Sequence, residues 1–176
     1  SASPKPATPD ALATVVRRLV EHHEWTGPVG VCMPSVVAHG IVRSAANIDK
    51  SWIDVDADAL FSSASGCDVH MLNDADAAGI AEMQFGVGAL VDGSPRPGVV
   101  MMLTFGTGIG SGLFVDGVLV PNTELGHLEL DGCDAESKAS AKAREREELS
   151  WKDWASRVQH YLSHVEALFS PDLFIV

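Results

Sequence analysis

Basic residues are scarce in this sequence, which has 12 lysines and arginines against 24 aspartates and glutamates and a formal net charge of −12. A protein that binds nucleic acid usually presents a basic face to the phosphate backbone. The acidic balance therefore argues against DNA or RNA as the main partner. An anionic ligand would have to be held by backbone amides, a metal ion or a small basic cluster.

Cysteine is rare as well, with only the widely spaced Cys32, Cys67 and Cys133. An odd, sparse set does not make a disulfide framework and is typical of reduced thiols, which predicts a cytoplasmic protein. No apolar run approaches 18 residues and no basic start precedes an apolar stretch, so we expect neither a membrane span nor a secretory signal. Hydrophobic residues still make up 46% of the 176 residues, so the chain can build a packed core in one ordinary domain or two small ones.

Apolar periodicity and turn residues predict short strands and helices along the chain. Thr8-Pro9 opens the first helix, and Asp116-Gly117 between two apolar triplets signals a tight hairpin. The other predicted strands are 29–33 and 69–72, both expected to be buried, and 40–45, 99–104 and 173–176. The other predicted helices are a short one within 52–65, 77–85, a charged solvated segment at 134–148, and 151–169.

A glycine-rich segment, GTGIGSG at 106–112, follows the most apolar strand. Glycine lets the backbone approach a ligand closely and present N–H groups to phosphate oxygens. The segment has no lysine for a Walker loop, and its glycine spacing does not match the dinucleotide fingerprint. We favour a β-turn-β phosphate loop that includes the Thr107 and Ser111 hydroxyls, and the alternative is a tight hairpin packed with small residues.

Asn73 and Asp74 follow a predicted strand, at the end where open α/β sheets place their ligands. A positioned carboxylate there can take a proton from a hydroxyl during phosphoryl transfer. The alternative is that Asp74 or Asp76 caps the next helix.

Glu124 and His127 stand three residues apart, and together they can grip neighbouring hydroxyls of a sugar. The alternatives are an exposed turn and a zinc site, but His127 with Cys133 supplies only two of the four ligands that structural zinc needs. No zinc or other protein-bound metal is therefore expected. A run of basic residues could track a polyanion, although interleaved glutamates favour a solvated helix face. That run consists of Lys138, Lys142, Arg144 and Arg146.

Three segments together resemble the ROK family of sugar kinases in their residues, their order and their spacing. They are LNDADAAGIAEMQFG (72–86), LTFGTGIGSGLFVDGVLV (103–120) and PNTELGHLEL (121–130). The cysteine-rich zinc segment usual in that family is absent after His127, and residues 134–155 in its place are similar to the polyphosphate glucokinase branch. The resemblance covers the chain from about residue 28.

The resemblance implies an α/β fold of the actin-like ATPase, or ribonuclease H-like, type with two lobes around a cleft. It assigns residues 1–72 to the N-terminal small lobe and 73–176 to the C-terminal large lobe. The family's first phosphate motif, Asp-x-Gly-Gly-Thr, is missing, and its adenosine motif would follow residue 176, so we expect an incomplete central fragment.

By the same resemblance, Asp74 is the general base that takes the proton of the sugar 6-hydroxyl. The implied sugar ligands are Asn73, Glu124, His127, Glu136 and Asn47. The implied phosphate-binding residues are Gly106, Thr107, Gly108 and Gly110. The expected substrates are glucose, with mannose as a second candidate, and polyphosphate or ATP together with Mg²⁺.

The family also contains transcriptional repressors, so the rival hypothesis is a sugar-sensing regulator without catalysis. Such a regulator would carry a basic helix-turn-helix and could dispense with the base at Asp74. The acidic chain and the presence of Asp74 favour the kinase, and family kinases are commonly homodimers.

Overall fold

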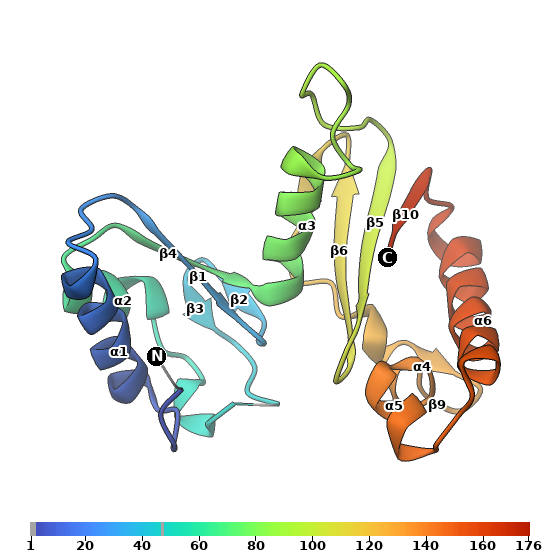
Figure 1. Ribbon diagram of the computed structural model, residues 1–176, viewed down its shortest axis with the longest axis horizontal. Coiled ribbons are helices and arrows are strands. Elements are labelled where there is room, and N and C mark those ends of the chain that lie inside the picture. The colour runs from blue at the N-terminus through green and yellow to red at the C-terminus, as the bar shows by residue number, and fades with distance from the viewer. Residues whose placement is uncertain (1–2, 47) are drawn as a thin grey trace. The chain divides into compact units, whose positions relative to one another are not determined.

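The computed structural model describes residues 3–46 and 48–176 (Figure 1). The chain divides into two compact units, Ser1–Asp74 and Ala75–Val176. The expected sugar ligand Asn47 lies outside the described residues. No helix in the described ranges is both long enough and apolar enough to cross a membrane.

The first unit packs two helices on one face of a two-stranded parallel sheet. The helices are α1 (Pro9–His22), which begins after Thr8, and α2 (Ala57–Ser65), and the strands are β1 (Val29–Met33) and β4 (Val69–Asn73). Met33 pairs with Asn73 in the parallel register. This pairing places the carboxyl ends of the two strands side by side, where ligand-binding side chains are expected in an α/β sheet.

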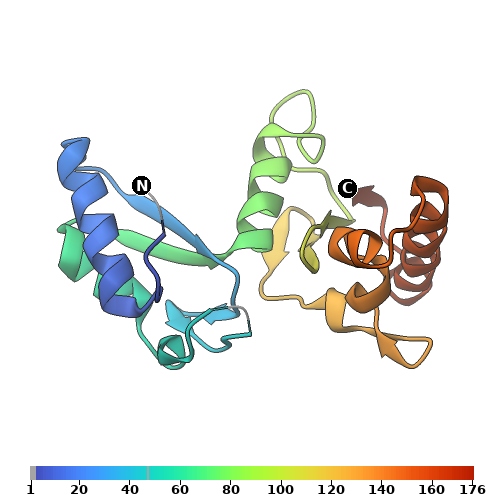
Figure 2. The same cartoon turned by 60° about the horizontal axis from the view of Figure 1, so that its bottom comes forward.

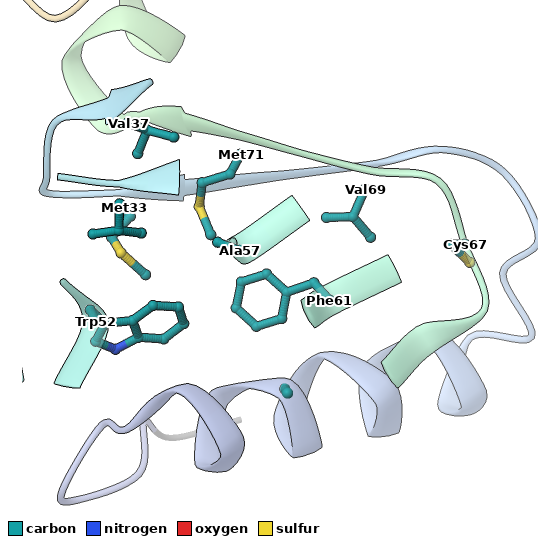
Figure 3. Close-up of a cluster of buried hydrophobic side chains, with 10 residues drawn as sticks. Met33, Val37, Trp52, Ala57, Phe61, Cys67, Val69 and Met71 are labelled. Carbon is teal, nitrogen blue, oxygen red and sulfur yellow. The ribbon is translucent and has the colours of Figure 1, made fainter. Parts of the chain in front are cut away.

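The core of this unit lies between the sheet and the helices (Figure 3). Trp52 and Phe61 are fully buried, with ring centroids 5.8 Å apart, and the side chains of Met33, Val69 and Met71 pack around them. The indole Nε1 of Trp52 donates a hydrogen bond to the carbonyl of Ala7, 2.9 Å away. Burial of the two large rings therefore fixes the helices on the sheet.

Two features of the first unit differ from the sequence prediction. β1 is only half buried, because its other face, with Gly30 and Cys32, is exposed. The predicted strand at 40–45 is a small hairpin of β2 (Val37–Ala38) and β3 (Ile41–Val42). His39 and Gly40 both have positive φ and make the turn between them, and a two-residue turn of this kind needs that backbone region. The connection to α2 contains a short helix, η1 (Lys50–Trp52).

The second unit is a four-stranded sheet with a helix on each face (Figures 1 and 2). The order is β10 (Leu173–Ile175), β5 (Val99–Phe105), β6 (Ile109–Val115) and β7 (Val118–Val120), with β10 parallel to β5 and the others antiparallel. Alternate residues of β5 face opposite cores. Met101 and Leu103 pack with α6 (Trp151–Phe169), and Val100 and Met102 pack with α3 (Asp74–Phe85). The strong apolar character of β5 thus reflects burial on both faces.

The segment between β7 and α6 is built from short elements. They are η2 (Leu125–His127), β8 (Glu129–Leu130), β9 (Cys133–Asp134), α4 (Glu136–Ala139) and α5 (Ala141–Arg146). The prediction of one solvated helix over 134–148 is wrong, because Ser140 is extended, ends α4 and caps α5 by accepting the N–H of Ala143. Ala139 and Ala143 are buried, and the Trp154 indole donates to the carbonyl of Ala139. The alanines therefore pack α4 and α5 inward rather than supporting a helix in solvent.

Candidate functional site

The glycine-rich segment forms the turn of the hairpin between β5 and β6. Phe105 pairs with Ile109, which leaves residues 106–108 as the turn, and Gly106 and Thr107 are exposed there. The N–H of Gly106 already donates to the carbonyl of Gly108, 2.9 Å away. Within the described ranges, the amides of Thr107 and Gly108 have no such acceptor. A phosphate at this turn would therefore meet those two amides and the Thr107 hydroxyl.

The remaining glycines of the segment lie in β6. Gly110 pairs with Thr104, and a Cβ on Gly110 would lie 2.6 Å from the Thr104 hydroxyl and 2.9 Å from the Cβ of Ala75. Close packing of α3 against the sheet thus explains Gly110 without a ligand. A phosphate-binding role for Gly110 stays a prediction.

Ser111 does not belong to the phosphate loop, contrary to the sequence analysis. Its side chain is buried, donates to the carbonyl of Thr123 over 2.6 Å, and accepts the N–H of Leu125 over 3.2 Å. Both bonds hold the segment that contains Glu124 and leads into η2. Ser111 therefore fixes the backbone beneath the predicted sugar ligands.

Three of the predicted sugar ligands gather in the second unit, together with a residue that the sequence analysis missed. The Nδ1 atom of His127 lies 3.0 Å from Oδ2 of Asp134 and 4.0 Å from Oε1 of Glu136. The hydrogen bond that the Asp134 carboxylate accepts, followed by the charges of Glu136 and Glu124, raises the pKa of His127 against the opposing effect of burial. A polar cluster of carboxylates around one imidazole can bind hydroxyl groups as both donor and acceptor.

Glu136 connects this cluster to the glycine turn. Its Oε2 atom accepts the N–H of Ile109 at 3.1 Å. A Cβ on Gly108 would collide with the same carboxylate, and a Cβ on Gly126 would lie 2.9 Å from it. The two glycines therefore leave the space that the Glu136 carboxylate occupies.

Burial and the charge of Glu136 also raise the pKa of Tyr161, whose hydroxyl donates to the carbonyl of Leu125 at 3.3 Å.

Gly126→Ala should destabilise this part of the molecule. Its Cβ would collide with the backbone carbonyl of Ile109, which cannot move without disturbing β6. Overpacking of this kind costs about 1–3 kcal/mol, and we expect that loss in the free energy of unfolding by urea. The control is Gly106→Ala, because a Cβ there has no atom within 4 Å, and a change within about 0.5 kcal/mol is expected. Equal losses for the two variants would contradict this packing argument.

Asn73 and Asp74 lie at the carboxyl end of β4, as the sequence predicts. Asn73 is buried, and its amide donates to the carbonyl of Ser35 at 3.1 Å, in the loop that follows β1. Asp74 is exposed and is the first residue of α3. Burial and the Asp74 charge raise the pKa of the neighbouring Cys32 thiol. Sequence reasoning missed Ser35, although its place two residues after the end of β1 was a usable signal.

The alternative that Asp76 caps α3 is wrong. Asp76 lies inside the helix, is buried, and accepts the N–H of Asn122 at 2.8 Å. This bond ties α3 to the segment after β7. Asp74 is at the first helical position, where the helix dipole favours a negative charge, and its role as the general base stays a prediction.

The basic residues at 138–146 do not form one helical face, because the helix breaks at Ser140. Lys138 and Arg146 lie 3.9 and 2.8 Å from the carboxylate of Glu147, which also pairs with Arg157. Hydrogen bonds from the two arginines lower the pKa of Glu147 to about 2. Lys142 differs, because its backbone N–H donates to the carbonyl of Gly106 at 3.1 Å. Among the described residues it has no ion pair, and its backbone lies beside the glycine turn.

Metal-binding side chains are not gathered in the described part of the chain. No group of three or more histidine, cysteine, aspartate or glutamate side chains there could hold a metal ion. The Cys133 thiol instead donates to the carbonyl of Leu130, 3.5 Å away.

Comparison with known proteins places this geometry in context. The model of the ROK family matches residues 1–143. The polyphosphate glucokinase of Mycobacterium tuberculosis (strain CDC 1551 / Oshkosh) is 47% identical over 174 residues, covering 98% of this chain and 64% of the relative. The polyphosphate glucokinase of Mycobacterium leprae (strain TN) is 44% identical, covering 98% of this chain and 52% of the relative. The chain thus spans less than two thirds of the length of these relatives.

A solved structure shows the same similarity. The inorganic polyphosphate/ATP-glucomannokinase from Arthrobacter sp. strain KM is 53% identical and superposes with a TM-score of 0.84, covering 98% of this chain and 69% of that one. The family match and this structural likeness confirm the actin-like α/β fold expected from the sequence, and they show that the chain belongs to the ROK family.

Proposed function

We propose that the full-length protein is a kinase that transfers a phosphoryl group from inorganic polyphosphate or ATP to the 6-hydroxyl of glucose, with mannose as a second acceptor. The relatives at 44–53% identity, which are polyphosphate glucokinases and a polyphosphate/ATP-glucomannokinase, support this proposal. The observation that carries it is the Glu136 carboxylate, which touches the glycine turn through Ile109 and approaches His127. One side chain therefore joins a phosphate-type turn to a sugar-type cluster.

In this proposal the polar side chains of the second unit hold the sugar. Glu124 and Glu136 accept hydrogen bonds from hydroxyl groups, and His127 donates one to a sugar oxygen. Asn73 stays a predicted sugar ligand, and within the first unit the bond from its amide to the carbonyl of Ser35 fixes its rotamer. Asn47 stays a predicted ligand.

The phosphoryl donor is proposed to meet the glycine turn. The amides of Thr107 and Gly108 and the Thr107 hydroxyl point to a site for phosphate oxygens. Mg²⁺ in kinases keeps several waters and is held largely by substrate phosphates. In this proposal Mg²⁺ therefore enters as part of the substrate, as Mg-polyphosphate or MgATP, whose charge it neutralises.

The proton of the 6-hydroxyl passes to the Asp74 carboxylate as the sugar oxygen attacks the terminal phosphorus. The bond from that phosphorus to its bridging oxygen breaks, which leaves ADP or a polyphosphate shorter by one unit. Orientation and charge stabilisation supply the rest of the acceleration. Assembly as a homodimer and a cytoplasmic location stay predictions.

The test is production of glucose 6-phosphate by the full-length protein with Mg²⁺ and either polyphosphate or ATP as the sole donor. Formation of product from polyphosphate supports the whole proposal. Formation of product from ATP alone supports the kinase activity but excludes polyphosphate as a donor. Glucose binding without product from either donor would favour a sugar-sensing regulator instead.

Lys142→Gln should weaken the use of long-chain polyphosphate more than the use of ATP. Its backbone lies beside the glycine turn, so its long side chain can reach a phosphate bound there, whereas Lys138 is engaged with Glu147. Loss of one phosphate contact should raise KM for polyphosphate about tenfold. Steady-state kinetics with both donors measures this effect.

The matched control is Lys138→Gln, which makes the same change four residues away and should alter KM for polyphosphate less than twofold. Equal effects of the two variants, or equal losses for both donors, would show that Lys142 has no specific role in binding polyphosphate.

A further inference from the structure

The β8–β9 hairpin brings Asp134 against His127. Asp131 and Gly132 both have positive φ and make a two-residue turn between the strands. The N–H of Ala135 donates to the carbonyl of Leu128 at 2.9 Å, which closes the loop directly after η2. The backbone therefore fixes Oδ2 of Asp134 at 3.0 Å from Nδ1 of His127.

The two carboxylates near the ring have different partners. The Oε2 atom of Glu136 accepts the N–H of Ile109, and its Oε1 atom lies 4.0 Å from Nδ1 of His127. Asp134 is about 1 Å closer to the ring and is the hydrogen-bond partner of Nδ1. In the described part of the chain, no hydrogen bond reaches Nε2 of His127. Nδ1 is thus occupied by Asp134, which leaves Nε2 as the nitrogen available for a ligand.

We propose that Asp134 is a positioning residue that orients His127 and holds it as a hydrogen-bond donor, through Nε2–H, to a sugar oxygen. The inference rests on the proposed function, because it takes His127 as a sugar ligand. It adds a residue that touches no substrate and acts only through the imidazole.

Charged groups around His127 from every neighbouring element agree with this role. Asp134 comes from β9, Glu136 from α4 and Glu124 from the segment before η2, and each raises the pKa of His127. Tyr161 from α6 is neutral in this range, because its own pKa is raised. Since the protonated ring donates from both nitrogens, sugar affinity should fall as the pH rises through the pKa of His127.

The experiment compares Asp134→Asn and Asp134→Ala in the full-length protein. Asparagine keeps an acceptor for Nδ1–H and loses the charge, while alanine loses both. We expect the pKa of His127, followed by NMR of its ring protons, to fall in both variants. We expect KM for glucose to rise about tenfold for alanine and less for asparagine, with kcat changed less than threefold. The decline of glucose affinity with pH should begin at a lower pH in both variants.

The chain provides a matched control in Asp131→Asn. Asp131 lies 2.9 Å from Nε2 of His160 and is similarly exposed, so the variant removes the same charge from an aspartate–histidine pair on the same hairpin. It should leave both the pKa of His127 and KM for glucose unchanged.

Two results would overturn the inference. One is an unchanged His127 pKa in Asp134→Asn, and the other is a shifted pKa with KM for glucose equal to that of the wild type. Failure of the proposed function would look different, because the wild-type protein itself would then form no glucose 6-phosphate from either donor, whether or not calorimetry shows that it binds glucose.

Discussion

Asp74→Asn should reduce kcat of the full-length kinase by at least about 100-fold, while the dissociation constant for glucose changes less than threefold. A positioned general base typically contributes about 10²- to 10⁴-fold. Asparagine has the size of aspartate and cannot take the proton at neutral pH. The loss should therefore appear in turnover and in kcat/KM to the same extent.

The position of Asp74 explains why this variant should still fold. Asp74 is exposed at the first position of α3, directly after the buried Asn73. Loss of a negative charge at a helix N-terminus costs only about 0.3–1 kcal/mol. The thermal midpoint should thus stay close to that of the wild type, and calorimetry with glucose should still report binding.

Asp68→Asn is the matched control for Asp74→Asn. Asp68 is an exposed aspartate directly before the other end of β4, so the variant makes the same change of charge near the same strand. It should leave kcat unchanged. If Asp74→Asn kept more than about one tenth of the wild-type turnover, Asp74 would not be the base.

The strands and helices that sequence reasoning found are those with strong local signals. β5 is a continuous apolar run because both of its faces are buried, and the Asp116-Gly117 turn lies between β6 and β7 as predicted. Ser150 accepts the N–H of Asp153 and starts α6, as the capping pattern indicates. Such signals depend on a few neighbouring residues and are therefore readable without a structure.

The missed elements are very short or depend on tertiary contacts. The β2–β3 hairpin has two residues in each strand, too few for a visible alternation. The break at Ser140 follows from burial of Ala139 and Ala143 beneath Trp154, which no local pattern announces. Helix propensity alone favours a continuous helix there, and packing overrides it.

The candidate site was predictable in part. Glu124, His127 and Glu136 were expected as sugar ligands, and the structure brings them together, although their roles stay predictions. Asp134 was missed despite an available signal, because Asp131-Gly132 is the same turn dipeptide as Asp116-Gly117. A hairpin about that dipeptide pairs Asp134 with Glu129 and directs the chain back toward His127.

Glu136→Ala should cause the second large loss, a fall in glucose affinity of about 10- to 100-fold. Hydrogen bonds to a charged group contribute about 1.5–3 kcal/mol, which corresponds to that range of dissociation constants. The variant also leaves the N–H of Ile109 without its acceptor and opens space beside Gly108 and Gly126. KM for the phosphoryl donor should therefore rise too, because the glycine turn loses its support.

Glu136→Gln separates the two roles of this side chain. The amide oxygen can still accept the N–H of Ile109 and fill the same space, so the turn should keep its shape and KM for the donor should stay near the wild-type value. Glucose affinity should still fall, because the charge is gone and one acceptor oxygen has become a donor. The control, Glu145→Gln in α5, neutralises an exposed carboxylate and should change neither constant. If Glu136→Gln weakened the donor and glucose equally, Glu136 would act as structural support for the whole region rather than as a ligand for the sugar.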